Sequence, residues 1–278
     1  FNFAYDVVDE IAKQEPDKKA VVWCNEQGDE KVLTFGEISR LSNQVANTLV
    51  NDGVKKGDMV LMILKRHYQF WYVMPALHKI GAVAIPATNL LTKKDLEYRF
   101  NAASVTTVIC TAEGEVSQHV IDALPASPTV KRLYSVNGDV EGFEKLDEKI
   151  KTASGEFARV ENSWRDPLLL YFTSGTTGLP KMVLHNHSYP IAHIITAKYW
   201  HNVDPDGLHL TVAETGWAKA VWGKIYGQWL VGAAVFVYDF NKFVPGDMLE
   251  VIQKYRITTF CAPPTIYRFF IKEDLTKY

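Results

Sequence analysis

The most informative stretch of this sequence is Tyr171-Phe172-Thr173-Ser174-Gly175-Thr176-Thr177-Gly178-Leu179-Pro180-Lys181. A buried strand over 168–172 is expected to lead directly into a loop with four hydroxyl side chains, two glycines and a terminal lysine. Glycines let a loop turn tightly and bring backbone N–H groups up to an anion. Hydroxyls can donate to phosphate oxygens, and the lysine adds a point charge. The pattern predicts a phosphate-binding loop; the plainer alternative is a ligand-free hairpin turn.

This loop differs from a Walker A loop, which needs G-x-x-x-x-G-K-[ST] followed by a helix. Here the residues after Lys181, Met182-Val183-Leu184, continue as a strand. The phosphates would therefore be held by a hydroxyl-lined flap between two strands, without a helix dipole behind them.

On both sides of the loop, apolar runs of strand length alternate with helical patterns. Thr34 with Glu37, and Thr92 with Asp95, are capping boxes that predict helix starts, and Gly53 is expected to end the first helix in a left-handed conformation. Buried or amphipathic helices are also expected over 68–80, 141–151, 188–200, 221–230 and 246–255. Strands are expected at 20–24, 31–33, 59–64, 82–86, 106–110, 130–136, 168–172, 208–213, 233–238 and 258–261. Regular alternation predicts a layered α/β fold with mostly parallel strands.

A polar stretch over 152–165 suggests a subdomain boundary. We expect an N-terminal α/β subdomain over residues 1–164 and a second α/β subdomain over 165–278, which begins with the phosphate loop and is incomplete at its C-terminal end.

Composition favours small-molecule substrates. Of the 278 residues, 47% are hydrophobic and 22% charged, and the formal net charge is −2. The chain therefore has no excess of basic residues that would bind a nucleic-acid backbone. The apolar runs are too short for a membrane span. Three widely spaced cysteines indicate a reducing compartment, and we expect a cytoplasmic protein. Because the chain begins with Phe1, we expect it to be part of a longer gene product.

The run T-S-G-T-T-G-L-P-K resembles the phosphate-loop signature of the adenylate-forming superfamily, which includes acyl-CoA synthetases, luciferases and peptide-synthetase adenylation domains. Three earlier stretches look like its N-terminal signatures: T-F-G-E-I-S-R-L-S-N-Q-V-A-N-T-L (34–49), G-V-K-K-G-D-M-V (53–60) and H-K-I-G-A-V-A-I-P (78–86). Phe172, Met182, E-T-G-W (214–217) and A-P-P-T-I-Y-R (262–268) are most similar to medium-chain acyl-CoA synthetases. Glu214 stands where that branch is expected to carry Asp.

The resemblance implies the N-terminal half of a large domain with helices packed on two sheets. It also implies a two-step reaction. A medium-chain or bulky short-chain carboxylate attacks the α-phosphate of Mg-ATP to give an acyl adenylate and pyrophosphate, and coenzyme A then displaces AMP. Activation is needed because a carboxylate is a poor electrophile, and catalysis of its adenylation rests mostly on positioning and charge neutralisation.

On this reading, the ATP phosphates bind Thr173, Ser174, Gly175, Thr176, Thr177, Gly178 and Lys181. The family's adenine-binding motif, Mg²⁺ ligands and catalytic lysine would lie beyond Tyr278. We therefore expect no catalytic residue and no metal ligand in this chain, which would be inactive without the rest of its own sequence.

Weaker candidates surround the loop. Trp217 could line an acyl pocket, or it could be a core residue beside Trp222 and Trp229. Thr265 and Tyr267 follow a strand end, where α/β sheets bind ligands, although Thr265 could equally cap a helix.

His185 and His187 are spaced as on one strand face. A hydrogen-bonding or helix-entry role is favoured for them over metal binding, because no third ligand is near in sequence. Lys219 and Lys224 are expected at the surface.

Two other functions remain open. The chain could be a non-catalytic nucleotide- or phosphate-binding module that uses only this loop, or an adenylation domain that loads a carrier protein.

Overall fold

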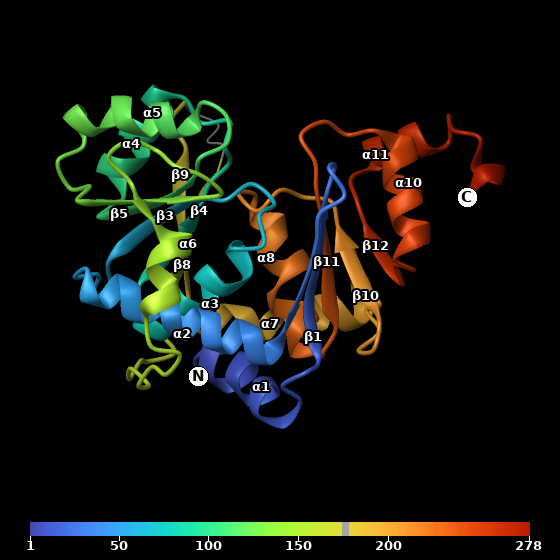
Figure 1. Cartoon of the computed structure of the whole chain (residues 1–278), viewed down its shortest axis with the longest axis horizontal. Helices are drawn as coiled ribbons and strands as arrows, with labels where there is room; N and C mark the ends of the chain where they lie inside the picture. The colour runs from blue at the N-terminus through green and yellow to red at the C-terminus, as the bar shows by residue number, and fades with distance from the viewer. Residues whose placement is uncertain (174–177) are drawn as a thin grey trace.

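The computed structural model describes residues 1–173 and 178–278 and contains two β-sheets (Figure 1). The first sheet has five strands in the order β12-β10-β11-β1-β2, and the second has seven in the order β7-β6-β5-β3-β4-β8-β9. Neighbouring strands are parallel except in two pairs, β1 with β2 and β8 with β9. The layered α/β fold with two mostly parallel sheets is therefore confirmed.

The strands of the five-stranded sheet are β1 (Lys19–Asn25), β2 (Glu30–Thr34), β10 (Leu208–Thr211), β11 (Ala234–Asp239) and β12 (Thr259–Cys261). Those of the seven-stranded sheet are β3 (Met59–Ile63), β4 (Val83–Pro86), β5 (Thr107–Thr111), β6 (Arg132–Val136), β7 (Glu144–Lys145), β8 (Pro167–Thr173) and β9 (Lys181–Asn186). The longer helices are α2 (Phe35–Asn51), α3 (Phe70–Ile80), α4 (Lys93–Ala102), α5 (Val116–Ala123), α7 (Tyr189–Ile195), α8 (Ala218–Lys224), α10 (Pro245–Lys254) and α11 (Pro264–Phe270). Shorter turns are η1 (Ala4–Asp9), α1 (Glu10–Gln14), η2 (Leu124–Ala126), α6 (Leu146–Lys149), η3 (Ile150–Thr152), η4 (Thr196–Trp200), α9 (Tyr226–Leu230) and η5 (Leu275–Lys277).

The layers follow from where each element buries its apolar side chains. The central core joins strand residues of both sheets, such as Val21 and Val60, to α2, α3 and α9. A second core lies between the seven-stranded sheet and α4 with α5, and a third between the five-stranded sheet and α10 with α11 (Figure 1). Every residue of α3 is buried, as its continuous apolar pattern predicts.

Both predicted capping boxes form. The Glu37 amide donates to Thr34 Oγ1 at 3.2 Å, and the Thr34 amide donates to Glu37 Oε2 at 2.9 Å. Thr92 and Asp95 make the same reciprocal pair at the start of α4. Gly53 has φ +89°, in agreement with the left-handed conformation expected there.

Several expected helices differ in the structure. The single helix expected over 141–151 is wrong, because Glu144 and Lys145 pair with β6 as the short strand β7 before α6 and η3 begin. The sequence interpretation omitted α5. The helix expected over 221–230 is interrupted at Ile225, whose φ of −148° and ψ of −70° are not helical.

The expected boundary at residues 164 and 165 does not coincide with the division between the sheets. Val21 of β1 pairs with Val235 of β11, and Leu169 of β8 pairs with Ala84 of β4. Each sheet thus contains strands from both proposed subdomains. The polar stretch between them is held in place, since Asn47 Nδ2 donates to the carbonyls of Ser154 at 3.0 Å and Glu156 at 2.8 Å.

Candidate functional site

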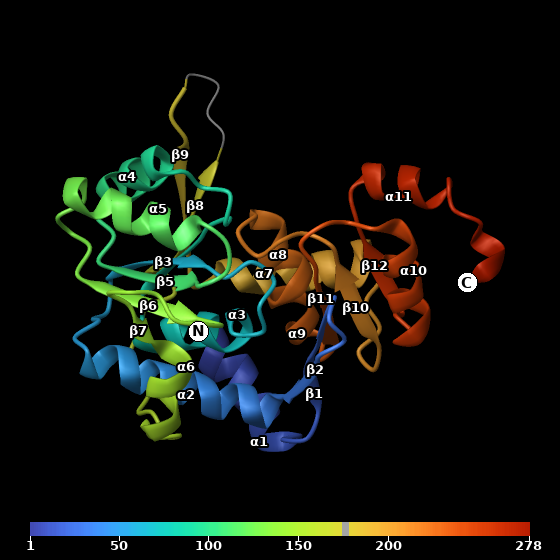
Figure 2. The same cartoon turned by 45° about the horizontal axis from the view of Figure 1, so that its top comes forward.

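The phosphate loop connects the two strands of a hairpin. Thr173, the last residue of β8, pairs with Lys181, the first residue of β9. The strand expected after Lys181 is confirmed, and strands β8 and β9 reach beyond the ends of β3 and β5 (Figure 2). The Tyr98 hydroxyl of α4 donates to the Pro180 carbonyl at 2.8 Å, which fixes the return of the chain onto the sheet.

The structure places only part of the predicted phosphate-binding set. Thr173 and Lys181 are exposed at the ends of the two strands, and Gly178 has φ +113°, a conformation that favours glycine. Four predicted members lie outside the described residues, namely Ser174, Gly175, Thr176 and Thr177. The assignment of these seven residues to ATP phosphates remains a prediction.

A cavity of about 430 Å³ lies at the base of the hairpin. Its walls come from the ends of β4 and β8, from α4, from the return of the hairpin and from the segment before α8. The lining residues are Pro86, Ala87, Thr88, Leu91, Arg99, Tyr171, Phe172, Thr173, Pro180, Gly216, Trp217 and Ala218. Since parallel strands bind ligands beyond their carboxyl ends, this is the expected position for a substrate site.

Trp217 lies at this cavity and is not a core residue. Its side chain is 60% exposed, whereas Trp229 is fully buried. The structure therefore brings Trp217 together with Thr173, the first predicted phosphate contact, around one cavity. This arrangement is compatible with an acyl-pocket role and excludes the alternative of a core tryptophan.

Thr265 and Tyr267 are not among the residues that line this cavity. They lie on α11, which follows β12 in the other sheet, and both are exposed. The Tyr267 ring packs on Phe260 and Phe270. Both residues follow the end of a strand, as expected, but that strand, β12, lies at the edge of the five-stranded sheet.

Sequence reasoning missed two polar residues of the cavity, Thr88 and Arg99. Thr88 could have been predicted from the sequence, because it lies two residues after the carboxyl end of β4, where parallel sheets bind ligands. Arg99 could not have been predicted, because it reaches the cavity only through the packing of α4 on the sheet. Its guanidinium lies 5.3 Å from the centre of the Phe172 ring.

Two charged side chains near Trp217 in sequence, Glu214 and Lys224, are buried. Glu214 is 7% exposed, its Oε1 accepts the Gly216 amide at 3.1 Å, and burial raises the pKa of its carboxyl. The expectation that Lys224 lies at the surface is wrong, because it is only 1% exposed and its Nζ donates to the Ala213 carbonyl at 2.8 Å. Burial lowers the pKa of Lys224 to about 7. These contacts fix the segment that carries Trp217.

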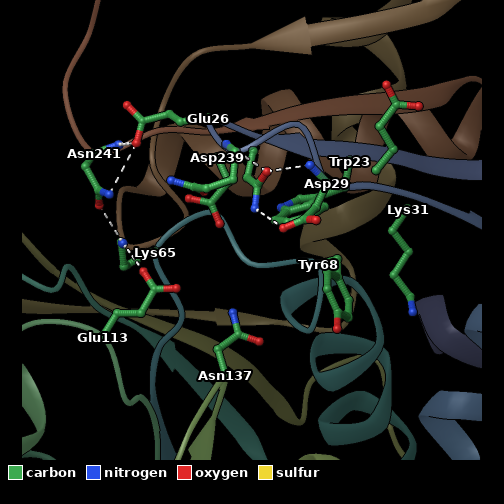
Figure 3. A pocket seen from close by; sticks show the side chains of 13 residues that line it. Trp23, Glu26, Asp29, Lys31, Lys65, Tyr68, Glu113, Asn137, Asp239 and Asn241 are labelled. Atoms are coloured by element: carbon green, nitrogen blue, oxygen red, sulfur yellow. Dashed lines mark hydrogen bonds and ion pairs between the residues drawn. The ribbon is translucent and has the colours of Figure 1, made fainter.

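A second, polar cavity lies between the carboxyl ends of strands from both sheets (Figure 3). Lys65 Nζ contacts Glu113 Oε2 at 2.5 Å and Asn241 Oδ1 at 2.9 Å, so its charge is already paired. The His67 ring is hydrogen-bonded through Nδ1 to Asp239 Oδ2 at 2.7 Å and through Nε2 to Thr111 Oγ1 at 2.8 Å. These bonds tie the two sheets together, and we assign the candidate site to the hairpin cavity instead.

His185 and His187 pack against aromatic rings. The His185 ring stacks on Tyr189 with centroids 3.8 Å apart, and His187 is fully buried near His78. Within residues 1–173 and 178–278, no group of three or more His, Cys, Asp or Glu side chains is placed to hold a metal ion. In the same ranges, no helix is long and apolar enough to cross a membrane.

The family model described as AMP-binding enzyme matches residues 8–278. The human mitochondrial acyl-coenzyme A synthetase ACSM3 is 33% identical over the whole chain, and human mitochondrial ACSM4 is 35% identical. The chain spans about half the length of these relatives, 48% and 49% respectively. Because these relatives are mitochondrial, the comparison contradicts the expected cytoplasmic location.

Two solved structures share the fold. An acyl-CoA synthetase of Brucella canis has a TM-score of 0.87 at 21% identity, over 98% of this chain and 49% of its own. The anthranilate CoA ligase AuaEII, in complex with anthranoyl-AMP, has a TM-score of 0.89 at 22% identity, over 99% of this chain and 53% of its own.

Proposed function

The chain belongs to the family of AMP-binding enzymes, and from this premise we propose that it supplies the phosphate loop and one wall of the acyl pocket of an AMP-forming acyl-CoA synthetase. The observation that carries the proposal is the cavity of about 430 Å³ at the base of the β8–β9 hairpin, which is lined by Thr173 and Trp217 together. The relatives named as acyl-coenzyme A synthetases support the same activity.

In this proposal the hairpin residues clamp the β- and γ-phosphates of ATP, and the acid's tail occupies the cavity. The carboxylate attacks the α-phosphorus, a new P–O bond forms, and pyrophosphate leaves. The thiol of coenzyme A then attacks the acyl carbon and releases AMP. Lys181 neutralises charge on the departing pyrophosphate, and Trp217 limits the depth of the acyl pocket.

Mg²⁺ would neutralise phosphate charge in the complete site, but the part of the chain that the structure describes contains no cluster of His, Cys, Asp or Glu to which we assign it. We propose that the missing groups come from the part of the family's length that this chain does not span. The 278-residue chain alone is then expected to make no acyl adenylate.

Replacing Lys181 with alanine in the full-length enzyme should lower the efficiency of adenylation roughly 10- to 100-fold. The reason is the loss of one charge-assisted contact worth about 1.5–3 kcal/mol. The measurement is exchange of labelled pyrophosphate into ATP that depends on a carboxylic acid. Thr177→Ala should show a loss of the same order if its hydroxyl also contacts phosphate.

The control for this experiment is Lys13→Ala, since Lys13 is an exposed lysine on α1, a helix that lies at the opposite end of the molecule from β8 and β9 (Figure 2). Exchange at the wild-type rate in Lys181→Ala would remove that residue from the phosphate site. Binding of ATP with no acid-dependent exchange, even in the full-length protein, would instead favour the non-catalytic module.

Replacing Trp217 with glycine should move the preferred acid to longer chains. Each methylene that fits the cavity adds about 0.8 kcal/mol until the chain meets the tryptophan, so kcat/KM should pass through one optimum in a series of straight-chain acids. The measurement is that length profile in the wild type and in Trp217→Gly. Because Trp217 is largely exposed, the variant should fold. An unchanged optimum would show that Trp217 does not limit the pocket.

A further inference from the structure

The turn between β3 and α3 contains a lysine in an unusual backbone conformation. Lys65 is 6% exposed and has φ +48°, a left-handed conformation that is uncommon for residues other than glycine. A residue keeps such a strained backbone only where the surrounding structure holds it. The contacts of Lys65 therefore identify what fixes this turn and what the turn fixes in return.

The side chain of Lys65 joins the two sheets at the polar cavity (Figure 3). Its ammonium group contacts Glu113 Oε2 at 2.5 Å and Asn241 Oδ1 at 2.9 Å. Glu113 lies two residues after the end of β5 in the seven-stranded sheet, and Asn241 lies two residues after the end of β11 in the five-stranded sheet. Lys65 is thus anchored to the carboxyl ends of strands from both sheets.

The backbone of Lys65 holds the segment that carries Trp217. The Lys65 carbonyl oxygen accepts the amide of Thr215 at 3.0 Å and also accepts the hydroxyl of Thr215. Because both donors belong to one residue and use both lone pairs of the carbonyl, they fix the orientation of Thr215 as well as its position. Thr215 is 1% exposed, so water does not compete for these bonds.

The end of β4 holds the same segment from another side. A Cβ atom on Gly216 would lie 2.2 Å from the Thr88 amide nitrogen, so the two backbones are in direct contact. The next residue, Trp217, has a side chain that is 60% exposed. The place of the Trp217 ring is therefore set by the backbone that carries it and not by a surrounding core.

We propose that Thr215 and Lys65 are positioning residues that determine which acid lengths the enzyme accepts. Neither belongs to the described lining of the hairpin cavity, so both act through the backbone from which Trp217 projects. This role rests on the proposed function, in which Trp217 limits the depth of the acyl pocket. A wall that is held less firmly should discriminate less sharply between acids that differ by one or two methylenes.

The first test is Thr215→Val in the full-length enzyme. Valine has nearly the shape of threonine and keeps the amide bond to Lys65, so only the hydroxyl bond is lost. The ratio of kcat/KM for the best straight-chain acid to kcat/KM for the acid two methylenes longer should fall roughly 2- to 10-fold. Thr215→Ser keeps the hydroxyl and should keep the wild-type ratio. An equal loss of kcat/KM for all acids in Thr215→Val would indicate a merely structural role and would overturn the proposal.

Thr48→Val is the matched control for that variant. Thr48 is 5% exposed on α2, and its hydroxyl donates to the Gln44 carbonyl at 2.8 Å. Each valine variant loses one buried hydroxyl bond to a backbone carbonyl, so both thermal midpoints should fall by similar amounts, within about 4 °C. Only Thr215→Val should change the acid-length profile.

Hydrogen–deuterium exchange of the full-length enzyme tests the contact without catalysis. Peptides that contain residues 214–217 should exchange roughly 2- to 10-fold faster in Thr215→Val than in the wild type, and peptides covering α2 should not change. Lys65→Met keeps the apolar stem but loses the ion pair with Glu113. It should speed exchange of the same peptides, and it serves as the second variant if Thr215→Val does not fold.

The outcomes separate this role from the proposed function. If Trp217→Gly changes the acid-length profile but the Thr215 and Lys65 variants change neither the profile nor the deuterium exchange of 214–217, the positioning role alone is overturned. If Trp217→Gly leaves the profile unchanged, the acyl-pocket role of Trp217 fails, and the acid-length role of Thr215 and Lys65 fails with it.

Discussion

Gly216→Ala is expected to destabilise the chain by about 3 kcal/mol, because no space exists for a side chain at this position. A Cβ atom there would lie 2.2 Å from the Thr88 amide nitrogen and 2.3 Å from the Ala87 carbonyl carbon. Both neighbours are backbone atoms, so they cannot rotate away. The segment from Glu214 to Trp217 would have to lift off the end of β4.

The consequence should be visible in both the stability of the chain and the solvent exposure of the cavity wall. The thermal midpoint should fall by roughly 6–12 °C, since about 1 kcal/mol corresponds to a shift of roughly 2–4 °C for a chain of this size. The quenching of the total tryptophan fluorescence by iodide should also change, because the exposed Trp217 lies on the cavity wall that moves. A midpoint within about 2 °C of the wild type would show that this close packing is absent in solution.

Gly246→Ala is the matched control for that variant. Gly246 lies within α10, and the nearest atom to an added Cβ is the Tyr278 hydroxyl at 3.1 Å, at the tip of a side chain. Alanine favours a helix over glycine by roughly 0.5–1 kcal/mol. This variant should therefore be as stable as the wild type or slightly more stable.

Acidification from pH 7 to pH 5 should destabilise the fold through its buried histidines. Burial lowers the pKa of His187 to about 4 and the pKa of His209 to about 3, against a usual value near 6.5. In this pH range the unfolded chain binds protons that the folded chain does not. Above about pH 6.5 both histidines are neutral in the folded and the unfolded chain, so they do not lower the free energy of unfolding. That free energy decreases as the pH falls from about 6.5 toward 4.

His187 gives the sharpest test of this pH dependence. It is fully buried, and neither ring nitrogen has a hydrogen-bond partner within residues 1–173 and 178–278. Its contribution to acid destabilisation at pH 5 should be about 2 kcal/mol. His187→Leu should remove that contribution while it keeps an apolar side chain in the core.

The measurement is urea unfolding of the wild type and His187→Leu at pH 8 and at pH 5. The stability difference between the two proteins should shift by about 2 kcal/mol in favour of the variant on going from pH 8 to pH 5. The pH 8 value serves as the internal control, because His187 is neutral there in both states. Parallel pH profiles would contradict the depressed pKa of His187.

The local features of this protein were determined by short stretches of sequence. The capping boxes at Thr34 and Thr92 form as predicted, because each needs only two residues three positions apart. The hairpin around the phosphate loop also follows from adjacent residues. Family membership rests on signatures that are continuous in sequence, and for that reason it could be inferred without the structure.

The arrangement of the sheets was decided by tertiary structure alone. No local signal indicates that β1 pairs with β11, because Val21 and Val235 meet only when more than 200 residues have folded between them. The two-residue strand β7 exists only because β6 offers it a partner. Residues 152–165 are polar, but they do not separate the two sheets. Long-range pairing gives each sheet strands from both sides of this stretch.

The candidate site shows the same division. Sequence identified Trp217 and the phosphate loop separately, since each belongs to a recognisable run. Their meeting around one cavity depends on Gly216, which packs against the end of β4, and on Arg99, which reaches the cavity from α4. Hydrogen bonds within a turn are set by neighbouring residues, whereas the shape of a cavity is set by side chains that approach from different elements. Sequence therefore determined which chemical groups this protein carries, and only the tertiary structure decided which of them share a site.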